Sequence, residues 1–258
     1  MRNATLAIVV LLLSAPAGAS PANGGAGPPV PAEVTAAVAD GARPAPQVEL
    51  DPARHPAELI AFTGLRRGDR IADLMPGNAY FTRIFSRVVG PRGRVYAFIP
   101  AQQLANCAPE ETAGTRALER NGSYPNVTVL IDATDRFAAP ELLDVVWTSQ
   151  NYHDLHDSFM APTDIARLNA AIFRALKPGG VFLVVDHAAQ PGSGLRDTET
   201  LHRIDPEAIR AEVTAAGFVL EAHSDLLRNP DDTHALRVFD PAIRYHTDQV
   251  VLKFRKPL

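Results

Sequence analysis

Short apolar runs alternate with amphipathic stretches from residue 51 to the end of the chain. The apolar runs, rich in β-branched residues, predict strands. These strands are Arg70–Leu74, Arg94–Ile99, Val127–Ile131, Leu142–Thr148, Val181–Val185, Phe218–His223 and Gln249–Lys253. The amphipathic stretches predict the helices Pro56–Phe62, Tyr80–Val89, Pro109–Asn121, Pro162–Leu176 and Asp205–Ala216. This alternation indicates an α/β protein with a largely parallel sheet, in which ligands bind at the carboxyl ends of the strands.

One long connection departs from this alternation. Residues Asn229–Asp248 are polar, show little periodicity and separate the last two predicted strands. Loops of this length inside a compact domain usually have a function. We therefore expect this stretch to form a lid or part of a site.

Composition and charge narrow the classes of protein. The chain is 46% hydrophobic and 21% charged, which excludes a coiled coil and a wholly disordered protein. Its 25 Lys and Arg residues stand against 29 Asp and Glu residues, so the charge balance gives no support to a nucleic-acid partner. Cys107 is the single cysteine, which excludes an intrachain disulfide and a cysteine-based zinc or iron–sulfur site.

The first 19 residues have the pattern of a secretory signal peptide. Arg2 precedes the apolar run Leu6–Leu13, and an Ala-x-Ala-like cleavage site ends at Ala19. The run is much shorter than the ~20 residues that cross a bilayer. We therefore expect an exported protein, in a bacterial periplasm, without a membrane anchor in its mature form. Residues 20–48 predict a flexible linker and an N-terminal segment: the linker is Ser20–Pro31, and a weak helix follows at Ala32–Ala39. Residues 49–258 predict the folded domain.

The loop after the first predicted strand carries the most specific motif. Its sequence, Asp73-Leu74-Met75-Pro76-Gly77-Asn78-Ala79, resembles the D-x-G-x-G-x-G loop of class I S-adenosylmethionine-dependent methyltransferases. Further family landmarks follow in order: Asp132-Ala133, LLDVVWTSQNYHDL, LKPGGVFLVVDH and TDQVVLKFRKP. More narrowly, the chain is similar to a group of exported bacterial proteins described as predicted methyltransferases. The resemblance implies a Rossmann-like seven-stranded sheet of order 3-2-1-4-5-7-6, with strand 7 antiparallel and helices on both sides.

The resemblance also implies S-adenosylmethionine as the cofactor. The residues that it places around this cofactor are Asp73, Met75, Gly77, Asn78, Ala79, Ile99, Asp132 and Ala133. Met75 and Ala79 depart from the family pattern, because they stand where glycines let the backbone approach a ligand. Ile99 departs further, because it stands where the family has an acid that accepts hydrogen bonds from the ribose. Each such charge-assisted bond is worth ~1.5–3 kcal/mol, so its loss would weaken adenosine binding.

A histidine–carboxylate cluster follows the fourth predicted strand. In the family fold, Tyr152, His153 and Asp154 lie in a loop that faces the reacting centre, and His187 ends the neighbouring strand. We expect these four residues to be catalytic, with His153 as a general base. A metal site also stays open, although the ligands are too few for a clear metal motif and no metal is assigned. Its ligands would be His153, His156 and either Asp186 or His187.

Three functional hypotheses follow from these features. The first is an S-adenosylmethionine-dependent methyltransferase for a small molecule, with the acceptor activated by His153 or Tyr152. The second is an exported enzyme that uses the same fold for other acid–base or metal-assisted chemistry. The third is a small-ligand binder without catalysis, against which the His153–Asp154 pair argues. No sequence feature indicates the substrate or the oligomeric state.

Overall fold

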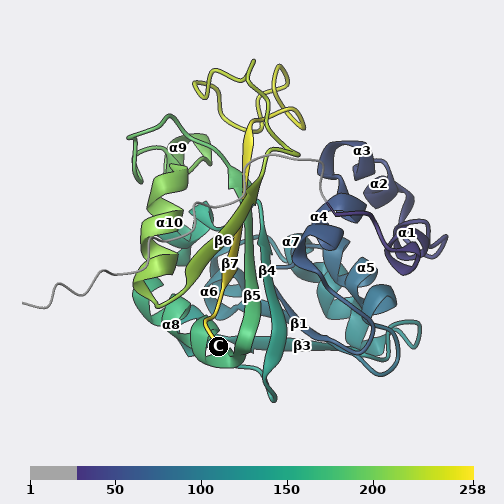
Figure 1. Cartoon of the computed structure of the whole chain (residues 1–258). Helices are drawn as coiled ribbons and strands as arrows, with labels where there is room; N and C mark the ends of the chain where they lie inside the picture. The colour runs from purple at the N-terminus through teal and green to yellow at the C-terminus, as the bar shows by residue number, and fades with distance from the viewer. Residues whose placement is uncertain (1–27) are drawn as a thin grey trace, which may run out of the picture.

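A single seven-stranded sheet organises the computed structural model, which describes residues 28–258 (Figure 1). The strands are β1 (Arg70–Leu74), β2 (Arg94–Pro100), β3 (Val127–Asp132), β4 (Leu143–Ser149), β5 (Leu176–His187), β6 (Val219–Ser224) and β7 (Gln249–Arg255). Their order is β3-β2-β1-β4-β5-β7-β6, and β7 runs antiparallel to both of its neighbours. The expected sheet is thereby confirmed. Its topological switch point lies between β1 and β4, where such folds bind ligands.

Helices cover both faces of the sheet (Figure 1). The α-helices are α1 (Ala32–Val38), α2 (Ala45–Val48), α3 (Asp51–Arg54), α4 (Pro56–Thr63), α5 (Tyr80–Val89), α6 (Ala101–Asn106), α7 (Glu110–Arg116), α8 (Ile165–Ala175), α9 (Thr198–Leu201) and α10 (Pro206–Ala215). Side chains alternate along a strand, so β2 contributes Val95 to the core beneath α4 and α5 and Phe98 to the core beneath α8 and α10. The two cores bury the apolar faces that the sequence pattern predicts.

Helix α5 shows how the sequence sets one element. Its side chains Phe81 and Phe85 pack on Trp147 of β4, with ring centroids 4.6 Å and 5.1 Å apart. The helix ends at Val89 and is capped by Gly90, whose φ of +65° is readily adopted only by glycine. Helix α5 and strand β1 both begin and end at the predicted residues.

The N-terminal segment that follows the expected linker is folded from residue 32 onward. The expected helix is present as α1, and its Val34 is fully buried against the core. Arg87 of α5 donates to Asp40, and Arg43 forms a 2.7 Å ion pair with Asp51. The N-terminal segment before residue 49 is therefore docked on the domain, because a few apolar side chains suffice to dock a short helix. The expected signal peptide, residues 1–19, lies outside the described residues.

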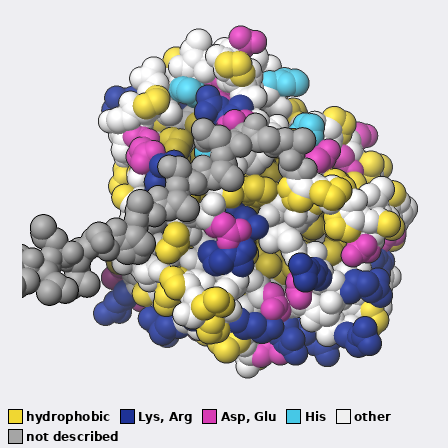
Figure 2. All heavy atoms as spheres, in the orientation of Figure 1, with side chains coloured by type: hydrophobic (Ala, Val, Ile, Leu, Met, Phe, Trp, Pro, Cys, Tyr) yellow, Lys and Arg dark blue, Asp and Glu magenta, His cyan; other side chains and the backbone are white. Residues whose placement is uncertain are grey.

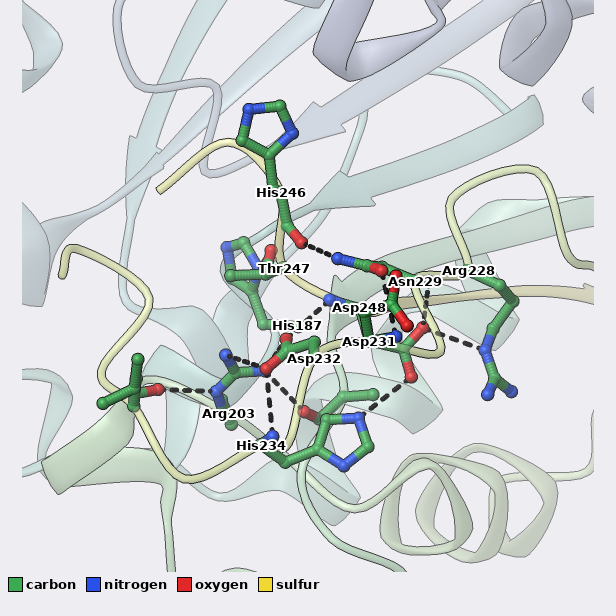
Figure 3. Close-up of polar contacts among 12 residues, drawn as sticks. His187, Arg203, Arg228, Asn229, Asp231, Asp232, His234, His246, Thr247 and Asp248 are labelled. Atoms are coloured by element: carbon green, nitrogen blue, oxygen red, sulfur yellow. Dashed lines mark hydrogen bonds and ion pairs between the residues drawn. The ribbon is translucent and has the colours of Figure 1, made fainter. Parts of the chain in front are cut away.

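The polar stretch between β6 and β7 lies at the end of the sheet where the parallel strands finish (Figure 1). Figure 3 shows its internal contacts. Fully buried Arg203 pairs with Asp232 at 2.8 Å, while Asp248 pairs with His234 at 3.0 Å and accepts from the backbone N–H of Asn229. Removing one partner of a buried ion pair costs roughly 3–5 kcal/mol. We infer that these ion pairs hold residues 229–248 in place. This stretch is called the roof below, because it lies over a cavity at this end of the sheet. None of the described helices is long and apolar enough to cross a membrane.

Candidate active site

A cavity of about 760 Å³ opens at the carboxyl ends of β1, β4 and β5. Its wall includes the loop after β1, residues 149–151, 153 and 154, Arg54, His187, His202, parts of α6 and α7, and the roof. The histidines visible in Figure 2 gather at this end of the molecule. A second hollow of about 900 Å³, between residues 46–55 and 226–249, contains none of the residues expected to act in catalysis or cofactor binding.

The loop after β1 keeps the backbone shape that glycines usually provide. Met75, Gly77 and Ala79 all have left-handed φ values, of +57°, +53° and +63°. Non-glycine residues in this region carry strain of order 1–3 kcal/mol, which persists only where neighbours hold the chain. The Asn151 side chain donates to the Met75 carbonyl at 2.7 Å, and Met75 N–H donates to the carbonyl of Phe98 at 2.9 Å. The two departures from the family pattern thus leave the shape of the loop intact.

A carboxyl group and a guanidinium group line the cavity beside this loop. Asp73 is buried, accepts a 2.6 Å hydrogen bond from the Thr82 hydroxyl, and burial raises its pKa to about 7. Arg54 lines another part of the same cavity, with its guanidinium 4.6 Å from the centre of the Tyr80 ring. Among residues 28–258, no carboxylate forms an ion pair with Arg54. An unpaired cation and a carboxyl group therefore face the same cavity.

Four of the expected cofactor residues lie outside the cavity wall. They are Ala79, Ile99, Asp132 and Ala133. Ile99 is fully buried in the core, and Asp132 is half-exposed and pairs with Arg136 at 3.0 Å. The structure thus places these four residues away from the cavity, whose wall on this side comes from α6 and α7. Asp73, Met75, Gly77 and Asn78 do line the cavity.

Helices α6 and α7 supply the wall in their place, through Gln103, Cys107 and Glu111. Gln103 is 8% exposed, and its Oε1 has no hydrogen-bond partner among the described residues. Buried acceptors are rarely left unpaired in native proteins. Burial raises the pKa of the Cys107 thiol to about 11, so it is uncharged at neutral pH.

His153 is held between two carboxylates. Its Nδ1 lies 2.8 Å from Asp186, its Nε2 lies 3.0 Å from Asp154, and its backbone N–H also donates to Asp186. Burial by itself lowers the pKa of His153, but the two carboxylates, Asp186 first, outweigh burial and raise that pKa to about 10. The two carboxylates therefore favour the positively charged imidazolium form of His153. This arrangement does not suit the general base that we expected at this position.

Two other expected catalytic residues have different surroundings. Tyr152 is fully buried away from the cavity, where its hydroxyl lies 3.0 Å from Glu212 and 2.9 Å from the Asn169 amide. Its expected catalytic role was wrong, because the side chain points into the core beneath α8. His187 does line the cavity, with Nδ1 2.8 Å from the Thr247 hydroxyl, and burial lowers its pKa to about 3. It is therefore a neutral imidazole.

Among the cavity residues that were not assigned from the sequence are Arg54, Gln103 and His202. Each comes from a short segment whose pattern predicts a helix or its start. His202 follows α9 and has a left-handed φ of +54°, an unusual conformation that no local pattern signals. Its Nδ1 lies 3.3 Å from His153 Nε2, although 49 positions separate the two residues. Arg54 is the last residue of a DPAR tetrapeptide, whose Asp-Pro start predicts only a helix.

Comparison with curated proteins finds methyltransferases. No protein-family model matches the chain. The chain is 29% identical over 200 residues to the ubiquinone/menaquinone biosynthesis C-methyltransferase UbiE of Vibrio cholerae, a match that covers 75% of this chain and 64% of that protein. It is 29% identical over 139 residues to the protein-L-isoaspartate O-methyltransferase of Ignicoccus hospitalis, covering 53% and 55%. The matches thus span less than two thirds of these relatives' length.

Comparison with solved structures shows the fold. A SAM-dependent methyltransferase from Aquifex aeolicus has a TM-score of 0.55 at 15% identity, and the match covers 83% of this chain and 94% of that one. The [4+2]-cyclase SpnF has a TM-score of 0.58 at 18% identity, covering 85% and 84%. Because one fold hosts different reactions, the function has to be argued from the cavity.

Proposed function

We propose that this chain, which has the fold and the sequence signature of the class I S-adenosylmethionine-dependent methyltransferases, binds S-adenosylmethionine in its central cavity and methylates a small molecule. One observation carries the proposal: Arg54 and Asp73 face the same cavity beside the loop after β1. The bound cofactor would supply an electrophilic methyl group on its sulfonium. The protein's residues bind, orient and enclose the reactants.

The charges of Arg54 and Asp73 fit the amino-acid end of the cofactor. The guanidinium of Arg54 suits a carboxylate, which it can hold by two parallel hydrogen bonds. The carboxyl group of Asp73 suits an ammonium group, whose positive charge favours the ionised form of a buried acid. Gly77 lines the cavity between them with a backbone that no Cβ shields.

Gln103 fits the sugar end. Its unpaired Oε1 can accept a hydrogen bond from a ribose hydroxyl, the task that an acid at position 99 performs in the related proteins. A neutral amide forms a weaker bond than a carboxylate. We therefore expect adenosine to be held less tightly than in proteins that keep the acid.

The acceptor molecule would occupy the rest of the cavity. His187 and the His153–Asp154 pair supply polar groups there, while Phe159 and Phe239 supply apolar walls. Holding two reactants in line converts a bimolecular step into an effectively unimolecular one and supplies a large part of the rate enhancement. The roof over the cavity shields such a complex from water.

Calorimetry of the full chain with two ligands tests this proposal. S-adenosylhomocysteine has both an amino-acid end and an adenosine, whereas methylthioadenosine lacks the amino-acid end. We expect S-adenosylhomocysteine to bind at least tenfold more tightly, because only it engages Arg54 and Asp73. Equal affinities would contradict the proposed binding mode.

A further inference from the structure

Three ligand atoms of the kind that bind transition metals form a small triangle in the cavity wall. His153 Nε2 lies 3.0 Å from Asp154 Oδ1 and 3.3 Å from His202 Nδ1, and His202 Nδ1 lies 3.6 Å from Asp154 Oδ1. Within residues 28–258, this is the one group of three such side chains close enough to share an ion. The histidine that completes it, His202, comes from a distant part of the chain.

The size of the triangle matches a tetrahedral metal site. Bonds of 2.0–2.1 Å to a tetrahedral Zn²⁺ place neighbouring ligand atoms about 3.3 Å apart. The three observed separations lie around this value, so the three ligand atoms have the spacing that one shared ion requires. His153, Asp154 and His202 all line the cavity, so a fourth coordination position would open into it. Three protein ligands with one open position are typical of catalytic sites.

The surroundings of His153 are those of a metal ligand. Asp186 is fully buried and binds Nδ1 of His153 at 2.8 Å, which orients the ring and directs Nε2 toward the triangle. A carboxylate on the far nitrogen is the usual partner of a metal-binding histidine. Asp154 and Asp186 together bring two negative charges, which a divalent ion would balance. Arg203 is engaged elsewhere, in its ion pair with Asp232 (Figure 3).

We propose that His153 Nε2, Asp154 Oδ1 and His202 Nδ1 bind one divalent transition-metal ion of the Zn²⁺ type. Its open position takes an oxygen or nitrogen atom of the acceptor molecule. The assignment of the acceptor rests on the proposed methyl transfer, whereas the metal site does not. A metal-bound hydroxyl loses its proton more easily than a free one.

Two residues beside the proposed metal site, Arg237 and His187, are not ligands of the ion. Exposed Arg237 donates to Nε2 of His202 at 2.8 Å. When Nδ1 of His202 binds a metal, Nε2 carries a proton, so Arg237 has to turn away toward solvent. His187 is outside the ligand set, because its ring centre lies 6.1 Å from that of His153 and its Nδ1 is engaged by Thr247. The structure thus pairs His153 with His202, and not with His187 as the sequence suggested.

The test uses Co²⁺ as a visible probe. The full chain, freed of metal by chelator and dialysis, is titrated with CoCl₂, and then with ZnCl₂ in competition. We expect one equivalent of Co²⁺ to give the intense visible absorption of a four-coordinate site, and one equivalent of Zn²⁺ to remove it. Loss of buried His153 risks unfolding, so His202→Ala, whose side chain is 15% exposed, and Asp154→Asn carry the test.

Matched variants make the outcome decisive. We expect His202→Ala and Asp154→Asn to weaken Zn²⁺ binding by at least about 100-fold. His223→Ala, on β6 and outside the cavity, is expected to bind as the wild type does, and Arg237→Ala as tightly or more so. Equal Zn²⁺ affinity of the wild type and His202→Ala would overturn the metal site. Binding of S-adenosylhomocysteine in the presence of chelator tests the proposed function separately, because Arg54 and Asp73 need no metal.

Discussion

The backbone N–H of Gly114 donates to Oδ1 of Asn78 across 2.8 Å, which fastens helix α7 to the loop after β1. A Cβ on Gly114 would lie 2.8 Å from the backbone oxygen of Asn78, closer than real Cβ atoms come. The neighbouring Thr115 hydroxyl donates to the carbonyl of Gly77 at 2.7 Å. Because position 114 is a glycine, helix α7 can approach the loop closely enough to form part of the cavity wall.

Substitution of this glycine tests that relationship. Gly114→Ala forces α7 away from the loop, and we expect a loss of about 1–3 kcal/mol in the free energy of unfolding together with weaker binding of S-adenosylhomocysteine. Urea denaturation and calorimetry measure the two effects. Gly122→Ala is the matched control, because a Cβ there meets open space. A Gly114→Ala protein as stable as this control would show that the contact is not tight.

Gln103→Leu tests the sugar end of the site. Because Oε1 of Gln103 has no partner among the described residues, we expect no loss of stability. Loss of one neutral hydrogen bond, worth about 0.5–1.5 kcal/mol, corresponds to binding weaker by about 2- to 10-fold. Gln190→Leu, at an exposed position, serves as the control. Unaltered affinity for S-adenosylhomocysteine in Gln103→Leu would remove Gln103 from the binding site.

Asp73 predicts a dependence of stability on pH. Burial raises its pKa from 3.8 to about 7, so the folded state favours the protonated acid. The free energy of unfolding should therefore fall as pH rises from about 4 to about 7, by an amount on the order of 4 kcal/mol. In Asp73→Asn this decline should disappear, which thermal melts of both proteins at several pH values can measure. Parallel stability curves for the two proteins would contradict a raised pKa.

The same pKa predicts how ligand binding depends on pH. The ammonium group of S-adenosylhomocysteine needs the ionised form of Asp73, so part of its affinity should be gained as pH rises through about 7. Both effects come from one carboxyl group. They should vanish together in Asp73→Asn.

Export stays a prediction from the sequence. We propose that the chain is cleaved after Ala19 and that the mature protein begins at Ser20. Mass spectrometry of the N-terminal peptide from the periplasmic fraction of an expressing bacterium measures this directly. An intact Met1 on protein confined to the cytoplasm would refute it.

The sheet and its main helices could be predicted from the sequence because each depends on a local apolar pattern. Strand β1 and helix α5 match to the residue, and the order of the strands followed from family landmarks. The cavity wall could be predicted only in part. Gln103 and His202 line the cavity together with segments that are distant in the sequence, and Ile99 is buried in the core instead of lining the cavity. A pattern along the chain does not report such contacts.

The central claim is that Arg54 anchors the amino-acid end of an S-adenosyl ligand, and one calorimetric comparison tests it most directly. S-adenosylhomocysteine is titrated into the wild type, Arg54→Ala and Arg92→Ala, the last an exposed arginine far from the cavity wall. We predict micromolar binding by the wild type and Arg92→Ala, and binding at least tenfold weaker by Arg54→Ala, as expected for the loss of a charge-assisted hydrogen bond worth about 1.5–3 kcal/mol. No binding by the wild type at millimolar ligand, or equal affinity in all three proteins, would contradict the account.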